Sequence, residues 1–373
     1  MSADIPTITL EIGKLENDKY PLRLLEKTAA GYKEKAAAEI DASEFDRSLW
    51  DFDPIEKFLE EPDESADFQI IGEKLYALIS KDRVGAEWKL LKAAQNNRFR
   101  VQLDIKAEEV SEFPWELAYR NDDADWLAVD GYHTFFRRFE SSAGIPGAAE
   151  NPSILRLLIV VGAEKDDTDI LPLAEVRKIQ LVVHSQNRTA PENKLFHRII
   201  DIDVLWQPNL NQITDKLKEF KPHIFHFIGH GGIDGDKAFL QLDTAGGGSI
   251  EWTHDAIRSD FRAAGVVLPR FVFINACRSQ NNAAGESELS ESELKRQAWS
   301  IGNIFRRLGV PAVLTMQADI GGEIAGEFSA AFYEALARLE PLDAALAAAR
   351  GKMMRYKGTS SERDWAIPVL TLA

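Results

Sequence analysis

The chain has 373 residues, of which 45% are hydrophobic and 28% are charged. This composition is that of a globular protein with enough apolar residues for a buried core, and it excludes wholesale disorder and collagen-like repetition. With 44 lysines and arginines against 60 aspartates and glutamates, the formal net charge is −16. Such acidity argues against direct binding to nucleic acid or to an anionic membrane surface.

The only cysteine is Cys277. One thiol forms no intramolecular disulfide and no cysteine-based zinc cluster, so we expect a reducing, cytoplasmic setting. No segment approaches the roughly 18 apolar residues of a membrane span, and the first residues lack the basic and apolar blocks of a signal peptide. We expect no cofactor and no metal.

Residues 1–152 mix strand and helix patterns and are expected to form a smaller α+β module. Apolar alternation or spacing predicts strands over 7–12, 98–105, 126–129 and 133–139, and helices over 55–59 and 71–78. An apolar cluster follows a turn at 113–119. Residues 141–152 are rich in Ser, Gly, Pro and Ala without apolar periodicity, which predicts a linker. The first domain is therefore expected to end at residue 152.

From residue 153 to residue 373, strand patterns alternate with helix patterns. Strands are predicted over 154–161, 199–205, 223–228, 239–242, 271–275 and 312–316, and helices over 173–185, 211–220, 253–262, 301–308 and 324–339. The run 154–161 is apolar except for Arg156, which is typical of a strand covered on both faces. This alternation predicts an α/β fold with a mostly parallel sheet flanked by helices.

Two of these strands end in residues that can carry chemistry. The 223–228 strand runs into Gly229-His230-Gly231-Gly232, and the 271–275 strand runs into Ala276-Cys277-Arg278. In open α/β sheets ligands bind beyond the carboxyl ends of the strands. If the two strands are neighbours, an imidazole and a thiol emerge together at one edge of the sheet.

That pair is what thiol catalysis requires. The thiolate is the nucleophile, and a nearby histidine lowers the thiol pKa or accepts its proton. The developing oxyanion needs preorganised donors. The glycine after the histidine lets backbone approach closely, so the N–H groups of Gly231 and Cys277 are the candidate donors.

The two motifs resemble those of the CHAT peptidases, relatives of caspases and separase. They read HFIGHGG over 226–232 and FINACRS over 273–279, and the resemblance extends through 309–317, 328–333 and 364–370. It covers roughly residues 153–373, and the segments 113–117 and 126–139 resemble what often precedes such domains. The resemblance implies a caspase-like fold, with His230 as catalytic base, Cys277 as nucleophile and Gly231 as oxyanion donor.

In the separase-like branch of that family, an acidic residue after the next strand binds a basic P1 side chain. The matching position is Asp319, and Glu323 is the second choice. The family often has Trp before this acid, whereas this chain has Ala318. A desolvated carboxylate selects Arg or Lys because a neutral side chain would leave its charge unpaired. Alternatively, Asp319 is an ordinary solvated loop residue.

Other residues have simpler interpretations. His226 lies within a strand and is interpreted as a core or supporting histidine. The three histidines at 223, 226 and 230 have helical spacing on a predicted strand, so a zinc site is not expected. The segment 245–249 lacks the Lys-Ser/Thr ending of a P-loop and predicts a hairpin tip. The polar segment 279–297 predicts a mobile loop. We further hypothesise that Lys295-Arg296 is a self-cleavage point if the enzyme cuts after basic residues.

The resulting hypothesis is a cytoplasmic cysteine endopeptidase that cuts a protein substrate after Arg or Lys. By resemblance to the family, a partner protein or signal activates it in a bacterial defence or stress pathway, and residues 1–152 dock or regulate. One alternative is a non-catalytic scaffold that binds a partner through a caspase-like fold. Another is a thiol hydrolase that acts on small amides.

Overall fold

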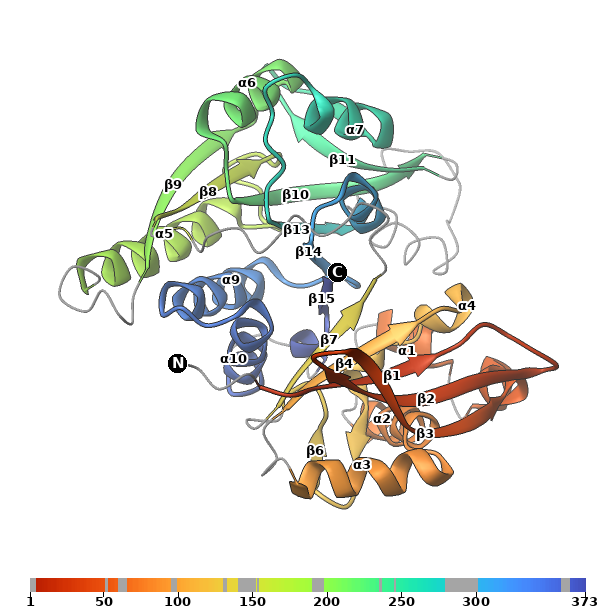
Figure 1. The fold of residues 1–373 in the computed structure, drawn as a ribbon. Coiled ribbons are helices and arrows are strands. Elements are labelled where there is room, and N and C mark those ends of the chain that lie inside the picture. Colours follow the sequence, from red (N-terminus) through yellow and green to blue (C-terminus); the bar gives the residue numbers. More distant parts are fainter. Residues whose placement is uncertain are drawn as a thin grey trace. The chain divides into compact units, whose positions relative to one another are not determined.

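The computed structural model describes residues 5–50, 53–59, 66–94, 99–129, 133–139, 152, 154–189, 198–234, 237–244, 246–278, 301–356 and 363–373. The chain folds into two compact units (Figure 1). The first comprises Met1–Phe139, Leu346–Met354 and Ser361–Ala366, and the second comprises Glu140–Ala345, Arg355–Ser360 and Ile367–Ala373. The predicted linker over 141–152 lies outside the described residues except for Pro152, so the boundary at 152 stays a prediction.

The first unit contains a mixed sheet in the order β3-β2-β1-β4-β7. Its strands are β1 (Thr7–Ile12), β2 (Lys19–Thr28), β3 (Gly31–Asp41), β4 (Phe99–Ile105) and β7 (His133–Arg138). β1, β4 and β7 are parallel, and β1, β2 and β3 are antiparallel neighbours. The long β2–β3 hairpin was not predicted, because its outer strand carries Lys, Glu and Ala and buries few side chains.

Helices and short turns complete the first unit. They are α1 (Pro54–Leu59), α2 (Ala66–Ile79), α3 (Asp82–Ala94), α4 (Glu108–Ser111) and the 3-10 turns η1 (Ala42–Phe45), η2 (Arg47–Leu49), η3 (Trp115–Leu117) and η4 (Asp364–Ala366). The strand predicted over 133–139 is confirmed as β7, whereas the strand predicted over 126–129 is wrong. The expectation that these two segments pair with each other is also wrong. Trp126 ends the short strand β6 (Asp125–Trp126), which pairs with β5 (Tyr119–Arg120), whereas β7 pairs with β4.

The second unit is built on a mostly parallel sheet. Its strands are β8 (Ile154–Val161), β9 (Ile199–Trp206), β10 (Ile224–Asp234), β11 (Lys237–Asp243), β12 (Ser249–Thr253), β13 (Phe271–Arg278), β14 (Ala312–Met316) and β15 (Pro368–Leu372). The parallel strands run in the order β9-β8-β10-β13-β14. β15 is antiparallel to β14, and the β11–β12 hairpin pairs with the end of β10. The predicted α/β fold class is confirmed.

Helices cover both faces of this sheet (Figure 1). They are α5 (Pro172–Thr189), α6 (Leu210–Phe220), α7 (His254–Arg262), α9 (Gly322–Ala337) and a helical segment over 301–308. The helix α10 (Leu342–Met354) follows α9, and its residues 346–354 belong to the first unit. On one face, which we call the α6–α7 face, side chains such as Phe225, Val272 and Phe305 form an apolar core. On the opposite α5–α9 face, Phe273 of β13 packs against Phe328 and Phe332 of α9. Side chains of opposite parity along each strand therefore enter different layers.

The C-terminal part of the chain supplies buried residues to the first unit. Arg350 of α10 is 1% exposed, and its guanidinium donates to the carbonyl oxygens of Ala128 and Phe135, both at 3.4 Å. Glu116 and Arg137, 1% and 2% exposed, form an ion pair beside it. Burial would raise the pKa of Glu116, but the charges of Arg137 and Arg350 outweigh it and lower that pKa. The first unit thus depends on residues far along the chain.

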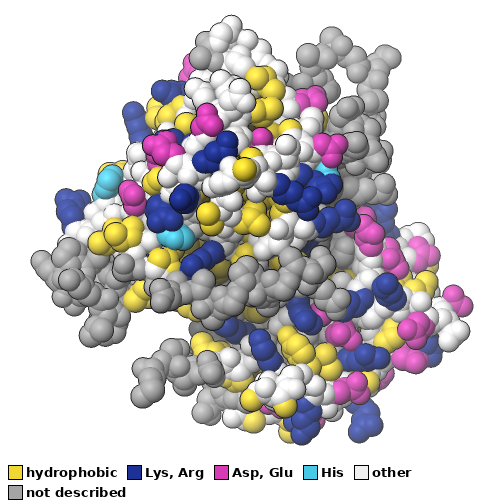
Figure 2. All heavy atoms as spheres, turned by 45° about the horizontal axis from the view of Figure 1, so that its top comes forward, with side chains coloured by type: hydrophobic (Ala, Val, Ile, Leu, Met, Phe, Trp, Pro, Cys, Tyr) yellow, Lys and Arg dark blue, Asp and Glu magenta, His cyan; other side chains and the backbone are white. Residues whose placement is uncertain are grey.

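Charged side chains of both signs cover the surface. Figure 2 shows groups of lysine and arginine side chains with acidic side chains between them. Exposed or half-exposed ion pairs include Lys178 with Glu327 at 3.2 Å and Lys216 with Asp203 at 3.1 Å. Such pairs contribute little to stability. The face shown in Figure 2 is therefore not uniformly acidic, despite the net charge of −16.

Candidate active site

The two motif-bearing strands, β10 and β13, are direct neighbours in the sheet. They pair in parallel from Ile224 with Phe271 to Gly231 with Arg278, and His230 and Cys277 are Cα partners in this register. The crossover between them contains α7. The backbone therefore brings the histidine and the cysteine to the same level at the carboxyl ends of adjacent strands, where ligands bind in open α/β sheets.

A third residue, Asp167, completes this arrangement. The Nε2 atom of His230 lies 2.7 Å from Oδ2 of Asp167. Because a carboxylate only accepts hydrogen bonds, Nε2 carries the proton, and in the neutral ring Nδ1 then has the free lone pair. That Nδ1 atom is buried and has no hydrogen-bond partner among the residues with described side chains, which do not include Cys277. Asp167 therefore holds one ring nitrogen, and the lone pair of the other is not used by any of these side chains.

The loop that carries Asp167 follows β8 and is held at several points. Oδ1 of Asp167 accepts the N–H groups of Asp169 at 2.9 Å and Ile170 at 2.8 Å, so the carboxylate closes its own turn. The ammonium of Lys165 lies 5.0 Å from the ring centre of Trp206 at the end of β9. These contacts fix the direction of the carboxylate before any ligand binds.

Hydrogen bonds also keep Asp167 ionised. Partial burial alone would raise the pKa of its carboxyl group, but the N–H groups of Ile170 and Asp169 and the His230 side chain outweigh burial and lower that pKa. Asp167 is therefore an anion at neutral pH. It orients the imidazole and stabilises an imidazolium ion when His230 accepts a proton.

The loop of Asp167 also contacts the start of α9. The Gly322 N–H donates to the Asp169 carbonyl oxygen at 3.2 Å. A Cβ atom at position 322 would lie 2.3 Å from the Ile170 carbonyl oxygen, so only glycine fits. Because the candidate specificity residue Asp319 precedes this glycine by three residues, its segment is tied directly to the loop that orients His230.

Below this edge, a layer of buried polar side chains lies on the α5–α9 face. His226 is 0% exposed and stacks on Phe273, its Cα partner, with ring centres 4.0 Å apart. The Tyr333 hydroxyl lies 3.1 Å from His226 Nδ1. Burial lowers the pKa of His226 to about 3, so this ring is neutral. His226 is a core histidine, as expected.

The same layer contains a fully buried carboxyl group, Glu175 of α5. It accepts hydrogen bonds from the Asn275 side-chain amide at 2.8 Å and from the Ser329 hydroxyl at 2.6 Å. His226 Nε2 lies 3.6 Å away. Burial raises the pKa of Glu175 to about 7, although the bonds from Ser329 and Asn275 oppose this rise. Asn275 precedes Cys277 by two residues on β13, so this carboxyl group is linked to the strand of the candidate nucleophile.

The other predicted site residues are placed as follows. Gly231 is buried in the sheet, with Leu240 and Arg278 as its Cα partners on the two sides. Asp319 follows β14, the neighbour of β13, and is half-buried. Glu323 lies in the first turn of α9 and accepts a 2.6 Å hydrogen bond from the Tyr356 hydroxyl. The oxyanion and P1 roles of these residues stay predictions, and the predicted loop over 279–297 lies outside the described residues.

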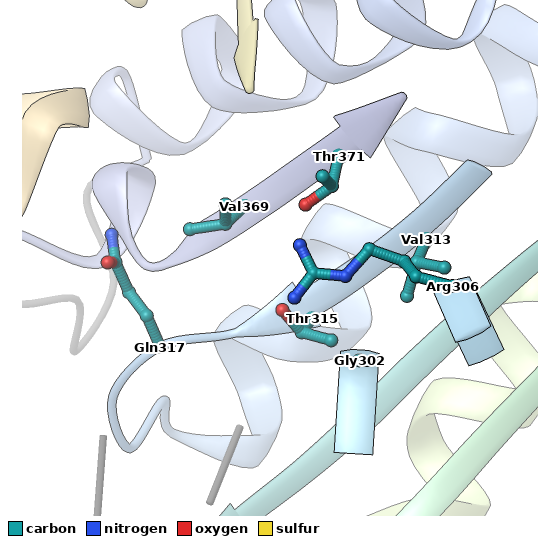
Figure 3. Close-up of a pocket in the computed structure, with 7 residues that line it drawn as sticks. All are labelled: Gly302, Arg306, Val313, Thr315, Gln317, Val369 and Thr371. Atoms are coloured by element: carbon teal, nitrogen blue, oxygen red, sulfur yellow. The ribbon is translucent and has the colours of Figure 1, made fainter. Parts of the chain in front are cut away.

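A small pocket lies between the 301–308 helix and strands β14 and β15. It is lined by Gly302, Arg306, Val313, Thr315, Gln317, Val369 and Thr371, and Figure 3 shows the Arg306 guanidinium reaching between Thr315 and Thr371. Val313 belongs to the core of the α6–α7 face, whereas His226 belongs to the opposite face. The pocket and the His230 site are therefore separate, and Asp319 and Glu323 are not among its lining residues.

The described side chains contain no cluster of three or more His, Cys, Asp or Glu residues that could hold a metal ion. His223 instead accepts the Arg156 N–H at 3.0 Å through Nδ1. Within the described part of the chain, no helix combines the length and apolar character needed to cross a membrane.

Sequence reasoning missed Asp167, Glu175 and Asn275. A usable signal for Asp167 was present, because the acidic segment 164–169 directly follows the apolar run of β8 and therefore lies at the carboxyl edge of the sheet. Glu175 and Asn275 are separated by 100 residues in the chain. Their contact depends on how α5 packs on β13, and short-range sequence patterns do not predict that packing.

A profile of the CHAT domain matches residues 69–371 of this chain. The match covers most of the sequence and begins within the first unit. The chain therefore belongs to the CHAT-domain family. Among curated protein sequences, none is significantly similar to it.

Comparison with solved structures gives matches of low score. The Arg-specific cysteine proteinase gingipain R matches with a TM-score of 0.42 and 12% identity, over 84% of this chain and 68% of the gingipain chain. Separase of Saccharomyces cerevisiae, solved in complex with securin, matches with a TM-score of 0.37 and 14% identity, over 89% of this chain and 23% of the separase chain. The chain thus spans less than a quarter of separase, and the family assignment rests on the CHAT match.

Proposed function

We propose that this CHAT-family protein is a cysteine endopeptidase with Cys277 as nucleophile and His230 as base. The observation that carries the proposal is the pairing of β10 with β13, in which His230 and Cys277 are Cα partners. Asp167 supports it, because the 2.7 Å bond to Nε2 leaves Nδ1 as the basic nitrogen. A buried basic nitrogen at the level of the only thiol is suited to proton transfer between them.

The reaction follows from these roles. His230 Nδ1 accepts the thiol proton of Cys277, and the thiolate attacks the scissile carbonyl carbon to form a tetrahedral intermediate. The N–H groups of Gly231 and Cys277 are the proposed donors to its oxyanion. The imidazolium then protonates the leaving amine as the C–N bond breaks, and water hydrolyses the remaining thioester with His230 again acting as base. Throughout, Asp167 holds the ring and compensates its positive charge.

The proposed substrate is a protein with Arg or Lys before the cleaved bond. Asp319 follows the strand next to β13, so its carboxylate is at the same edge as position 277. Its segment is tied through Gly322 to the loop of Asp167. A substrate side chain that engages Asp319 would therefore be held beside the residues that orient the base. Glu323 is less suitable because it is exposed and already accepts the Tyr356 hydroxyl.

We further propose that a partner protein or signal activates the enzyme in a bacterial defence or stress pathway, with the N-terminal module as the receiving part. This role follows from the family resemblance. The module is not a simple appendage, because residues 346–354 and 361–366 complete it. Identifying proteins captured by the inactive Cys277→Ala variant tests both the substrate and the activator.

A probe with a basic P1 residue and a thiol-reactive group tests the proposal directly. We expect it to label the native protein and to fail with Cys277→Ala and His230→Ala, because one removes the nucleophile and the other its base. Asp319→Ala is expected to reduce labelling by the basic probe far more than labelling by a matched neutral probe. Equal effects on both probes would refute the assignment of Asp319.

The same experiment separates the alternative functions. A non-catalytic scaffold would show no labelling that depends on His230. A thiol hydrolase of small amides would be labelled and would turn over a small amide, but it would not cleave protein. Cleavage of a protein substrate after Arg or Lys, lost in Cys277→Ala, supports the endopeptidase.

A further inference from the structure

Glu175 forms the centre of a buried clamp between three elements of the second unit. Its carboxyl group on α5 accepts the Asn275 amide from β13 at 2.8 Å and the Ser329 hydroxyl from α9 at 2.6 Å. The three side chains are at most 2% exposed. Buried hydrogen bonds to a carboxylate are stronger than neutral ones, so this clamp fixes β13 against both helices.

The clamp is located where it can act on the proposed nucleophile. Asn275 is two residues before Cys277, which corresponds to a distance of about 7 Å along a strand. The pairing of β13 with β14 in the sheet ends at Ile274 with Thr315, one residue before Asn275. Between the described residues, the first contact of β13 beyond this pairing that involves another helix is the bond from Asn275 to Glu175. On the other side, pairing with β10 continues to Arg278.

We propose that Glu175 is a positioning residue for Cys277: by holding Asn275, it fixes the end of β13 so that the thiol stays in register with His230. This inference rests on the proposed function, since it concerns the same thiol and imidazole. The proposal gives the buried carboxyl group of Glu175, on α5, a role beyond packing.

Glu175 acts on the thiol pKa in two ways, through the position of Cys277 and through its own negative charge. These two contributions have opposite signs, so they can be separated. A negative charge near a thiol disfavours the thiolate and raises its pKa. Removing that charge alone therefore lowers the thiol pKa or leaves it unchanged. Loss of positioning separates the thiol from His230 and raises its pKa toward the ordinary value of about 8.5. The other ionisable groups around Glu175 are His226, Tyr333 and Lys178, and they are the same in all variants of the clamp.

Glutamine at position 175 can preserve the clamp without the charge. Its side-chain oxygen can accept the Ser329 hydroxyl, and its amide can donate to Asn275 after the Asn275 amide turns over. Oδ1 of Asn275 is buried and has no hydrogen-bond partner among the described residues, so it is available as that acceptor. Glu175→Gln therefore tests the charge, whereas Glu175→Ala tests the clamp.

The experiment measures the pKa of the Cys277 thiol from the rate of alkylation by iodoacetamide at different pH values. Because Cys277 is the only cysteine, each rate reports one thiol and needs no substrate. We expect Glu175→Ala to raise the thiol pKa by about one unit, and Asn275→Leu, which keeps a similar volume, to do the same. Glu175→Gln is expected not to raise it. Tyr333→Phe is the matched control, because it removes a hydroxyl from the same buried layer without touching the clamp.

Unchanged thiol pKa values in Glu175→Ala and Asn275→Leu would overturn the proposal. So would an equal rise in Glu175→Gln or in Tyr333→Phe, since the effect would then not follow from loss of the clamp. If Glu175→Ala does not fold, Asn275→Leu decides alone. His230→Ala is included to separate this inference from the proposed function. A thiol pKa that does not change in His230→Ala refutes the histidine–cysteine pair and the clamp with it, whereas a change in His230→Ala alone refutes only the clamp.

Discussion

Replacing Glu175 by glutamine should change how the stability of the protein depends on pH. The carboxyl group is fully buried, and burial raises its pKa from the ordinary 4.5 to about 7 in the folded state. Because the folded-state pKa is the higher one, the folded protein binds the proton more tightly than the unfolded chain does. Its contribution to stability is therefore fully present below pH 4.5 and is lost as the pH rises toward 7.

The size of the effect follows from the shift. A rise in pKa from 4.5 to about 7 corresponds to about 3 kcal/mol over the whole titration, most of which falls between pH 5 and pH 8. Glutamine does not titrate, so Glu175→Gln lacks this loss. As the pH rises from 5 to 8, the unfolding free energy of the variant should therefore increase by about 2–3 kcal/mol relative to that of the native protein. The substitution can also shift the stability by a constant amount, which does not affect this comparison.

Urea unfolding at pH 5 and at pH 8, followed by tryptophan fluorescence, measures this difference. His226 is present in both proteins, and burial keeps its pKa low in the folded state. The quantity to compare is the change between pH values in each protein, not the absolute stability of either. The stability of the native protein and that of the variant could instead change with pH by the same amount, to within about 1 kcal/mol. That result would show that the pKa of Glu175 is not raised in the folded state.

Two further outcomes are expected. Asp167→Asn should lower kcat for peptide hydrolysis by about 10²- to 10⁴-fold with little change in KM. The reason is that the amide neither compensates the charge of an imidazolium nor fixes the position of the proton on the ring. A loss of kcat below tenfold would show that Asp167 does not orient His230. Arg137→Met should destabilise the first unit by about 3–5 kcal/mol because it leaves Glu116 buried without its main partner. The double variant Arg137→Met with Glu116→Leu should recover much of that loss in denaturant unfolding, and no recovery would contradict the account of this buried ion pair.

The order of strands and helices in the second unit, and the two strand ends that carry His230 and Cys277, were predictable from the sequence. The predominantly apolar runs 154–161 and 271–275 have the length and composition of strands covered on both faces, and turns and helices follow them at regular intervals. These signals are local, because the spacing of apolar residues along the chain can be read from a short segment without knowledge of the tertiary structure. The β2–β3 hairpin had no such signal, because a half-exposed edge of a sheet has little apolar pattern to detect.

Only the tertiary structure could decide which distant side chains complete the site. The register of β10 with β13 aligns His230 with Cys277, and the turn after β8 brings Asp167 to the histidine. The bond between Glu175 and Asn275 joins residues 100 positions apart, and α10 carries Arg350 to the buried carboxylate of Glu116 in the first unit. Polar residues at such positions have no periodic pattern of their own. Their partners are set by how helices pack on the sheet, and burial then makes each of those hydrogen bonds necessary.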